Sequence, residues 1–148
     1  MGLTDTLSAR FDVAERGSDV GTELLAGLTT FLTMSYIIVV NPVILSQAID
    51  VGENTFQLLA VVTILASVAA MLVMGLYADL PFGLAPGMGL NAFFVVVVVE
   101  LKIPWETALA AVFLEGVLFI LLTAVGAREY VIRLFPKPVK LSVAAGIG

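Results

Sequence analysis

Four long runs without charged residues constrain this sequence more than any other feature. No Asp, Glu, Lys or Arg occurs in residues 24–49, 54–78 or 80–99, and Glu115 is the one charge in residues 107–127. Each run reaches the ~20 residues that cross a hydrocarbon core about 30 Å thick. A water-soluble protein could not readily bury four such helices in succession. We therefore predict an all-α integral membrane protein.

The composition supports this class and narrows the chemistry. Hydrophobic residues make up 60% of the chain and charged residues 13%, whereas a soluble domain carries about 25% charged residues. The formal net charge of −5 argues against a nucleic-acid partner. The sequence has no Cys and no His, which excludes thiolate or imidazole metal sites and a histidine proton relay. We expect no metal and no cofactor.

The uncharged runs define the predicted organisation. A polar segment at 1–23 precedes a membrane domain at 24–148, with spans at about 24–46, 55–78, 81–99 and 106–127 and a further span from 139. The last apolar run, Leu141–Gly148, is too short to cross a bilayer. We expect the chain to be the N-terminal part of a longer polypeptide, either as a fragment or as a truncated reading frame.

Basic residues predict the orientation of these spans. Some basic residues precede the first span and others follow the fourth, and four crossings return the chain to the side on which it started. Six of the seven basic residues therefore lie on one side, and only Lys102 lies on the other. Because positive residues concentrate on the cytoplasmic side of short loops, the N-terminus is predicted to be cytoplasmic. The six residues are Arg10, Arg16, Arg128, Arg133, Lys137 and Lys140.

Two flanking segments have the pattern of short surface helices. Apolar residues fall four apart near the N-terminus, at Leu3, Leu7 and Phe11, which favours a helix on the membrane surface; a frayed polar tail is the alternative. In residues 128–137 the pair Glu129 and Arg133 has helical spacing, so we interpret this segment as an interfacial helix rather than an ordinary loop.

The third predicted span contains too many helix breakers for a continuous membrane helix. Pro and Gly cost about 3 and 1 kcal/mol relative to Ala inside a helix. We predict an extended stretch at about 82–85 followed by a half-helix from near Gly87 to Val99. Discontinuous helices of this kind expose backbone groups at transporter binding sites. The breakers are Pro81, Gly83, Pro86, Gly87 and Gly89.

Asn91 lies near the start of this half-helix. Its amide offers both donors and an acceptor, which match the edge of a planar heterocycle. Phe93 and Phe94 follow closely and can stack on such a ring. The alternative is that Asn91 caps the half-helix and that both phenylalanines face lipid or neighbouring helices.

The same segment also matches two common short motifs. Residues 87–92 fit the dinucleotide-binding pattern G-x-G-x-x-A, but that site requires a βαβ unit, so we reject it here. Gly83 and Gly87 form a G-x-x-x-G pair, which permits close helix packing and is compatible with a broken span. No nucleophile–base pair or cofactor motif remains, so an enzyme is not expected.

Hydroxyl side chains cluster in the first span. Such residues often bond to their own helix, but five within eight positions also favour a face turned toward a polar interior. They are Thr29, Thr30, Thr33, Ser35 and Tyr36. Asn41-Pro42 is predicted to kink or end this helix near the outer surface.

Glu115 is the single charge of the fourth span. A carboxylate inside a membrane is costly and marks a functional candidate, for proton coupling or for pairing with another helix. A carboxylate beside a water-filled cavity, or a neutral hydrogen-bonded one, is the alternative.

Taken together, TTFLTMSYIIVVNPVIL in the first span, APGMGLNAFF in the third and the ELLAG approach after Thr22 resemble the adenine/guanine/hypoxanthine permeases. These proteins form the AzgA-like branch of the nucleobase:cation symporter-2 (xanthine/uracil permease) family. The resemblance extends from Thr22 to the end of the chain.

The resemblance implies about fourteen membrane segments in two inverted repeats (7+7), arranged as a core and a gate domain, that import purine bases, generally with protons. It places the base between the half-helices of the third and tenth segments. By position, Asn91 would be a substrate-site residue. Backbone groups of Gly89, Leu90 and Ala92 would line the site, and Thr33 and Ser35 would approach from the first segment.

The resemblance also sets what this chain lacks. The acidic residues expected to hold the base and carry the proton belong to the eighth and tenth segments, outside this sequence. Glu115 matches no such position. We therefore expect partners: a purine base, a proton or sodium ion, the bilayer and the remaining C-terminal segments, with a homodimer left open.

The plasma membrane is the expected location. The alternatives are a uracil/xanthine or anion carrier of the same fold, or a membrane module or remnant that does not transport.

Overall fold

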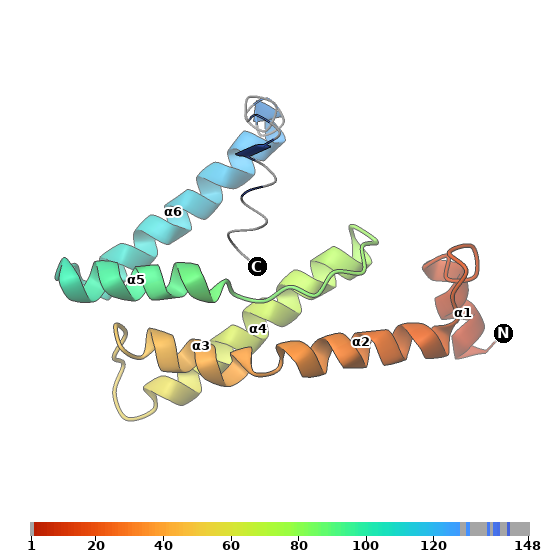
Figure 1. Ribbon diagram of the computed structural model, residues 1–148, viewed down its shortest axis with the longest axis horizontal. Coiled ribbons are helices and arrows are strands. Elements are labelled where there is room, and N and C mark those ends of the chain that lie inside the picture. The colour runs from red at the N-terminus through yellow and green to blue at the C-terminus, as the bar shows by residue number, and fades with distance from the viewer. Residues whose placement is uncertain (1, 128–129, 131–135, 137, 140–141, 143–148) are drawn as a thin grey trace. The chain divides into compact units, whose positions relative to one another are not determined.

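The computed structural model describes all residues except 1, 128–129, 131–135, 137, 140–141 and 143–148 (Figure 1). The chain divides into two units, residues 1–102 and 103–148, which we describe separately. The helices of the described part are α1 (Leu3–Arg10), α2 (Val20–Met34), α3 (Ile37–Leu45), α4 (Thr55–Leu76), α5 (Met88–Glu100) and α6 (Trp105–Ala124). The all-helical prediction is confirmed for these residues.

Helix α2 begins four residues before the predicted span because Asp19 caps it. The Asp19 carboxylate accepts hydrogen bonds from the Thr22 backbone N–H at 3.0 Å and from the Thr22 hydroxyl at 2.6 Å. An N-cap of this type satisfies a free N–H of the first turn and so stabilises the start of the helix. The uncharged run therefore marks the apolar part of the helix and not its start.

The first predicted span is interrupted, but not at Asn41-Pro42. It consists of α2 and α3 with a turn at Ser35 and Tyr36, and Pro42 lies inside α3. Next to and within this turn, the hydroxyls of Thr33 and Ser35 donate to carbonyls three residues earlier, at 2.8 and 2.9 Å. Hydroxyl groups bonded in this way compete with the backbone ladder and bend helices, which accounts for the position of the interruption.

Helix α4 is continuous and ends at Leu76, shortly before residues that disfavour a helix. Its C-cap is Tyr77, and Asp79 then adopts a left-handed backbone conformation with φ of 51°. Asp tolerates this region better than most residues do. Pro81 follows, and the residue before a proline is disfavoured in a helix. The chain therefore cannot continue α4 into the third predicted span.

Residues 80–87 carry neither helix nor strand, and α5 begins at Met88. At a rise of 1.5 Å per residue, the 13 residues of α5 cover about 20 Å, less than the ~30 Å hydrocarbon core. The prolines and glycines of the preceding stretch explain why the helix starts so late. α5 alone is accordingly too short to cross the hydrocarbon core.

Three stretches are long and apolar enough to cross a membrane: Val20–Leu45, Thr55–Leu76 and Trp105–Ala124. Their apolar side chains are largely exposed; Leu24 is 68% exposed and Ile120 68% exposed. Among the described residues, buried hydrophobic side chains are limited to Val13, Ile49 and Ala108. A water-soluble protein does not leave so much apolar surface uncovered. The chain is a membrane protein.

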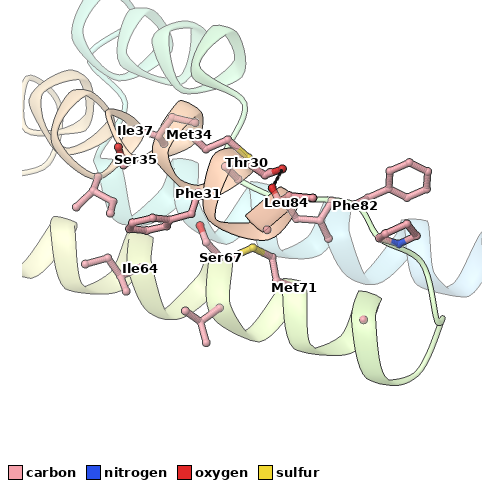
Figure 2. Close-up of a pocket in the computed structure, with 18 of the residues that line it drawn as sticks. Thr30, Phe31, Met34, Ser35, Ile37, Ile64, Ser67, Met71, Phe82 and Leu84 are labelled. Atoms are coloured by element: carbon pink, nitrogen blue, oxygen red, sulfur yellow. Dashed lines mark hydrogen bonds between the residues drawn. The ribbon is translucent and has the colours of Figure 1, made fainter. Parts of the chain in front are cut away.

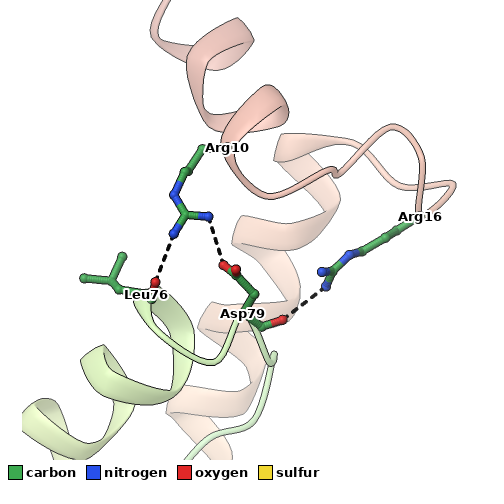
Figure 3. A network of polar contacts seen from close by, with 4 residues as sticks. All are labelled: Arg10, Arg16, Leu76 and Asp79. Atoms are coloured by element: carbon green, nitrogen blue, oxygen red, sulfur yellow. Dashed lines mark hydrogen bonds and ion pairs between the residues drawn. The ribbon is translucent and has the colours of Figure 1, made fainter.

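The polar N-terminal segment forms helix α1 and contacts the end of α4 (Figure 3). The Arg10 guanidinium donates to the Leu76 carbonyl at 2.9 Å and forms an ion pair with Asp79 at 3.1 Å. Arg16 donates to the Asp79 carbonyl at 3.5 Å. Because both partners of the ion pair are about half exposed, the pair contributes at most about 1 kcal/mol. Its effect is mainly to attach α1 to the start of the non-helical segment.

Two predictions from the sequence lie largely outside the described residues. They are the interfacial helix at 128–137 and the further span from 139. Both stay predictions.

Asp19 gives a prediction about pH. The Thr22 hydroxyl, and after it the Thr22 backbone N–H, donate to the carboxylate and lower the pKa of Asp19 below the ordinary 3.8. Because the folded-state pKa is the lower one, the cap stabilises α2 above pH 3.8 and is lost as the pH falls through the folded-state pKa. We expect the NMR resonance of the Thr22 amide in micelles to titrate with a midpoint below 3.8.

Asp19→Asn is the matched control for this titration. It keeps an acceptor at the cap but cannot ionise, so the Thr22 resonance should not titrate. A wild-type midpoint at or above the ordinary value would contradict the proposed cap.

Candidate functional site

Helix α3 is the element that brings the candidate site together. It packs against α4, which follows it directly in the sequence, and also against α5, which comes after α4. Asn41 lies on α3, Thr63 on α4 and Asn91 on α5. Asn41 is 2% exposed and Thr63 is 5% exposed, whereas Asn91 is partly exposed. One polar side chain from each helix therefore meets in an otherwise apolar contact.

These three side chains form a continuous chain of hydrogen bonds. The Thr63 hydroxyl donates to the Leu59 carbonyl of its own helix at 2.7 Å. Asn41 donates through Nδ2 to Thr63 Oγ1 at 2.9 Å. Asn91 donates through Nδ2 to Asn41 Oδ1. Buried polar groups that lack partners are costly in a low-dielectric interior, and here each buried group has one.

The first turn of α5 presents free backbone donors next to this hydrogen-bond network. Gly87 is the N-cap, has no side chain that caps the helix, and accepts from the N–H groups of Leu90 and Asn91. For the N–H groups of Met88 and Gly89, no acceptor is recorded in the described part of the chain. Free N–H groups and the positive end of the helix dipole favour electron-rich ligand atoms.

The alternative role for Asn91, capping α5, is wrong. Asn91 is the fourth residue of the helix, and its amide bonds across to Asn41 on α3. The neighbouring residues predicted for the site are exposed on the surface of α5. Leu90 is 77% exposed and Phe93 is 66% exposed, and Gly89 and Ala92 are also exposed. Their surfaces are available for contact in this part of the chain.

A pocket of about 400 Å³ lies elsewhere in the same unit, between α2, α4 and the non-helical segment before α5 (Figure 2). Phe31 of α2 reaches toward Ile64 and Ser67 of α4 in this view. The wall is mainly apolar, and its polar residues are Glu23, Thr30, Ser35, Thr63 and Ser67.

This pocket and the predicted site overlap only in part. Of the residues predicted for the site, Ser35 lines the pocket, and Asn91 does not. Thr63 belongs both to the pocket wall and to the hydrogen-bonded chain. We place the candidate site at Asn91 because recognition of a polar ligand needs converging donors and acceptors, which the apolar pocket offers sparsely.

The hydroxyls of the first span behave as the simpler interpretation predicts. Thr29 and Thr30 donate to carbonyls four residues earlier, at 2.8 and 3.0 Å, and Thr33 and Ser35 donate to carbonyls three residues earlier. Thr33 is exposed and lies outside the pocket lining. A ligand that bonds Thr33 or Ser35 would have to use the lone pairs of their oxygens.

Glu115 belongs to the second unit, near the middle of α6, and is exposed. Within the described residues, no ion pair or side-chain hydrogen bond of Glu115 is found. Its coupling role stays a prediction.

Reasoning from the sequence missed Asn41 and Thr63. Asn41 is predicted together with Pro42 to kink or end a helix, and Thr63 is one of three hydroxyl residues in the apolar helix α4, with Thr55 and Ser67. An asparagine amide in a membrane helix is itself a signal, because it needs partners inside the protein. Which partners it finds depends on the packing of α3.

Comparison with known proteins decides the family. Residues 21–148 match the family model of the xanthine/uracil permeases, described as the permease family. The chain belongs to the xanthine/uracil permease family. The match begins at the start of α2 and includes the segment that carries Asn91.

Several curated relatives of this chain are named as permeases. A protein of Methanocaldococcus jannaschii that is named as a permease is 49% identical over 139 residues, 93% of this chain and 31% of the relative. The adenine permease AdeQ of Escherichia coli is 42% identical over 144 residues, 97% of this chain and 32% of the relative. The guanine/hypoxanthine permease PbuO of Bacillus subtilis is 43% identical over 141 residues, 93% and 32%.

The chain thus spans about a third of the length of the curated relatives it matches. No solved structure matches it significantly.

Gly83 gives a prediction about the segment that leads to the site. A Cβ at this position would lie 2.8 Å from Met34 Sδ and 2.9 Å from Thr30 Cγ2, both on α2. Gly83→Ala should therefore displace the segment from α2 and lower the thermal unfolding temperature in detergent. Thr30→Ser removes the Cγ2 methyl, so the double variant should recover part of the loss.

Gly75→Ala is the matched control. A Cβ at Gly75 would meet nothing within 4 Å, and alanine is the better helix residue, so stability should not fall. Equal unfolding temperatures for Gly83→Ala and wild type would refute the close contact.

Proposed function

We propose that this chain is the N-terminal part of a secondary active transporter that imports purine nucleobases by proton symport. The observation that carries the proposal is the polar junction at the start of α5, where the Asn91 amide and free backbone N–H groups lie together on a permease-family segment. Relatives at about 42% identity are named as adenine and guanine/hypoxanthine permeases, which supports purines as the substrate class.

In this proposal the third membrane segment is broken, with residues 80–87 as its non-helical half and α5 as its helical half. Exposed backbone in a membrane must line a cavity or be covered by protein. Within an inverted-repeat (7+7) fold, the start of α5 would face segments that lie outside this chain. A base held between the two would meet Asn91, the backbone of Gly89, Leu90 and Ala92, and the ring of Phe93.

The chemistry of a purine base suits this set of groups. Its ring nitrogens and exocyclic groups alternate donors and acceptors along one edge, and its face is apolar and polarisable. The free N–H groups of the first turn would bond acceptors on the base, while the amide of Asn91 would supply a further polar contact. Phe93, two residues after Asn91 on the same helix, is 66% exposed and would supply an aromatic face for stacking. Thr33 and Ser35 are proposed as more distant contacts.

The remaining parts of the proposal concern location and partners. Basic residues on one side of the spans favour a cytoplasmic N-terminus in the plasma membrane, and α1 would then lie on the cytoplasmic face. The C-terminal segments of the complete transporter would supply the acidic groups that bind the base and the proton. Glu115 is the candidate for a coupling group within this chain.

The first test is uptake of radiolabelled adenine, guanine and hypoxanthine into cells that lack purine transport. The cells express the chain together with its native downstream sequence. We expect saturable uptake, and a rise of roughly tenfold or more in KM for Asn91→Ala, because the variant loses a ligand contact and leaves Asn41 Oδ1 without its donor. Surface protein is quantified in parallel.

Thr123→Val is the matched control for this test. The Thr123 hydroxyl donates at 2.8 Å to the carbonyl of Phe119 in its own helix, so its loss should leave KM unchanged. Absence of purine uptake by correctly expressed wild-type protein would overturn the substrate class. Competition by uracil or xanthine in preference to adenine, guanine and hypoxanthine would assign a different carrier of the same fold.

Coupling gives a separate prediction. If protons drive import, a protonophore should abolish accumulation of the base above its external concentration, and replacement of sodium by potassium should have no effect. A requirement for sodium would overturn proton symport while leaving purine transport intact. Glu115→Gln tests the carboxylate of the fourth predicted span: a coupling role requires loss of accumulation with exchange of internal for external base preserved.

A further inference from the structure

Hydrogen bonds link the Leu59 carbonyl, Thr63, Asn41 and Asn91 in that order. The direction in which each bond is donated determines which atom of Asn91 is free. That the free atom meets a substrate rests on the proposed function. The orientation of the amides follows from the hydrogen bonds of Thr63, Asn41 and Asn91.

The first link is fixed by the Thr63 hydroxyl. It has a single hydrogen, which it donates to the Leu59 carbonyl at 2.7 Å. Toward Asn41 the Thr63 oxygen can therefore act only as an acceptor. The group of Asn41 that faces it must be the donor, Nδ2, at 2.9 Å. With that hydroxyl donating to Leu59, the nitrogen end of the Asn41 amide is assigned to Thr63.

The second link passes this orientation to Asn91. With Nδ2 of Asn41 turned to Thr63, Oδ1 of Asn41 faces α5 and requires a donor. Asn91 supplies it through Nδ2. With the Thr63 hydroxyl donating to Leu59, reversing one of the two amides alone would oppose two oxygens or two NH2 groups in a site where Asn41 and Thr63 are 2% and 5% exposed. Such an arrangement would leave buried polar groups unpaired, which is costly.

One acceptor remains at the Asn91 end of this hydrogen-bond network. Asn91 is partly exposed, and no donor in the described part of the chain is recorded for its Oδ1. We infer that Asn41 and Thr63 are positioning residues, which hold the Asn91 amide with its carbonyl oxygen toward the substrate. Asn91 then accepts a hydrogen bond from an N–H of the base.

This orientation complements the backbone donors of the first turn of α5. Those N–H groups bind acceptors on the base, while Asn91 Oδ1 binds a donor. Together, the backbone donors and Asn91 Oδ1 distinguish two kinds of ligand. One is a purine that presents an N–H beside an acceptor, and the other is an analogue in which a methyl group replaces that hydrogen. A site built to accept a donor rejects the methylated analogue strongly because its acceptor is left unpaired.

The inference is tested with Thr63→Val in the transporter expressed with its native downstream sequence. Valine has nearly the shape of threonine but cannot accept from Asn41, so the amides of Asn41 and Asn91 lose their fixed orientation. We expect KM for the transported base to rise roughly three- to tenfold, with the maximal rate per surface molecule unchanged. Thr63→Ser, which retains the hydroxyl, should restore the wild-type KM.

The decisive comparison repeats Thr63→Val in the Asn91→Ala background. If Thr63 acts through Asn91, the second substitution should not raise KM further, because the group it orients is gone. An equal rise in both backgrounds, or a failure of Thr63→Ser to restore KM, would show a general packing role and overturn the inference.

The failure of this inference and that of the proposed function are distinguishable. If wild type transports purines and Asn91→Ala impairs uptake while Thr63→Val does not, the positioning role is wrong and the binding site stands. If wild type transports no purine, the proposed function fails, and the substrate step of the inference fails with it.

A probe series gives an independent readout in the same cells. Inhibition constants are measured for the transported base and for its N-methylated derivatives, one ring or exocyclic nitrogen at a time. Wild type should discriminate most strongly against one derivative, and Thr63→Val should reduce that single ratio. A uniform change across all derivatives would contradict an orienting role.

Discussion

The arrangement of the first unit depends on one constraint: the amide of Asn41 lies in an apolar helix contact and must be hydrogen-bonded there. An unpaired amide in such surroundings costs several times what a satisfied hydrogen bond contributes. Thr63 and Asn91 satisfy it from two other helices. The packing of α3 against α4 and α5 is therefore tied to a polar contact that has few alternative partners.

This constraint explains how a helix as short as α5 is held in place. Its apolar residues alone do not specify which face contacts α3, since valines occupy five successive positions from Val95 to Val99. The link from Asn91 to Asn41 supplies that specificity. Interhelical polar contacts in membranes are individually modest, averaging about 0.6 kcal/mol, so their value lies in selecting one orientation.

The segment before α5 is shaped by a different requirement, the absence of side-chain volume. Gly83 passes close to Thr30 and Met34 on α2, and the prolines around it prevent a helix. At its start, Asp79 is held by Arg10 from α1. This non-helical segment, joined to α1 at its start and close to α2 at Gly83, leads directly into the first turn of α5. The candidate site is thus built by backbone geometry as much as by its side chains.

The sequence by itself determined the membrane class, the positions of three long apolar helices and the late start of α5. The physical reason is that these depend on local properties: runs without charge, and prolines and glycines that prevent a helix. The family resemblance rested on equally local motifs, and residues 21–148 match that family. Asn91 was identifiable because an amide beside helix breakers is unusual in an apolar segment.

Only the tertiary structure decided which groups Asn91 meets. Asn41 and Thr63 are 22 residues apart, and Asn91 is 50 residues from Asn41, so no local pattern connects them. The interruption at Ser35 and Tyr36 was likewise hidden, because hydroxyls in a helix predict back-bonding but not where it bends the chain. Hydrogen bonds between helices follow from packing, and packing is a property of the whole fold.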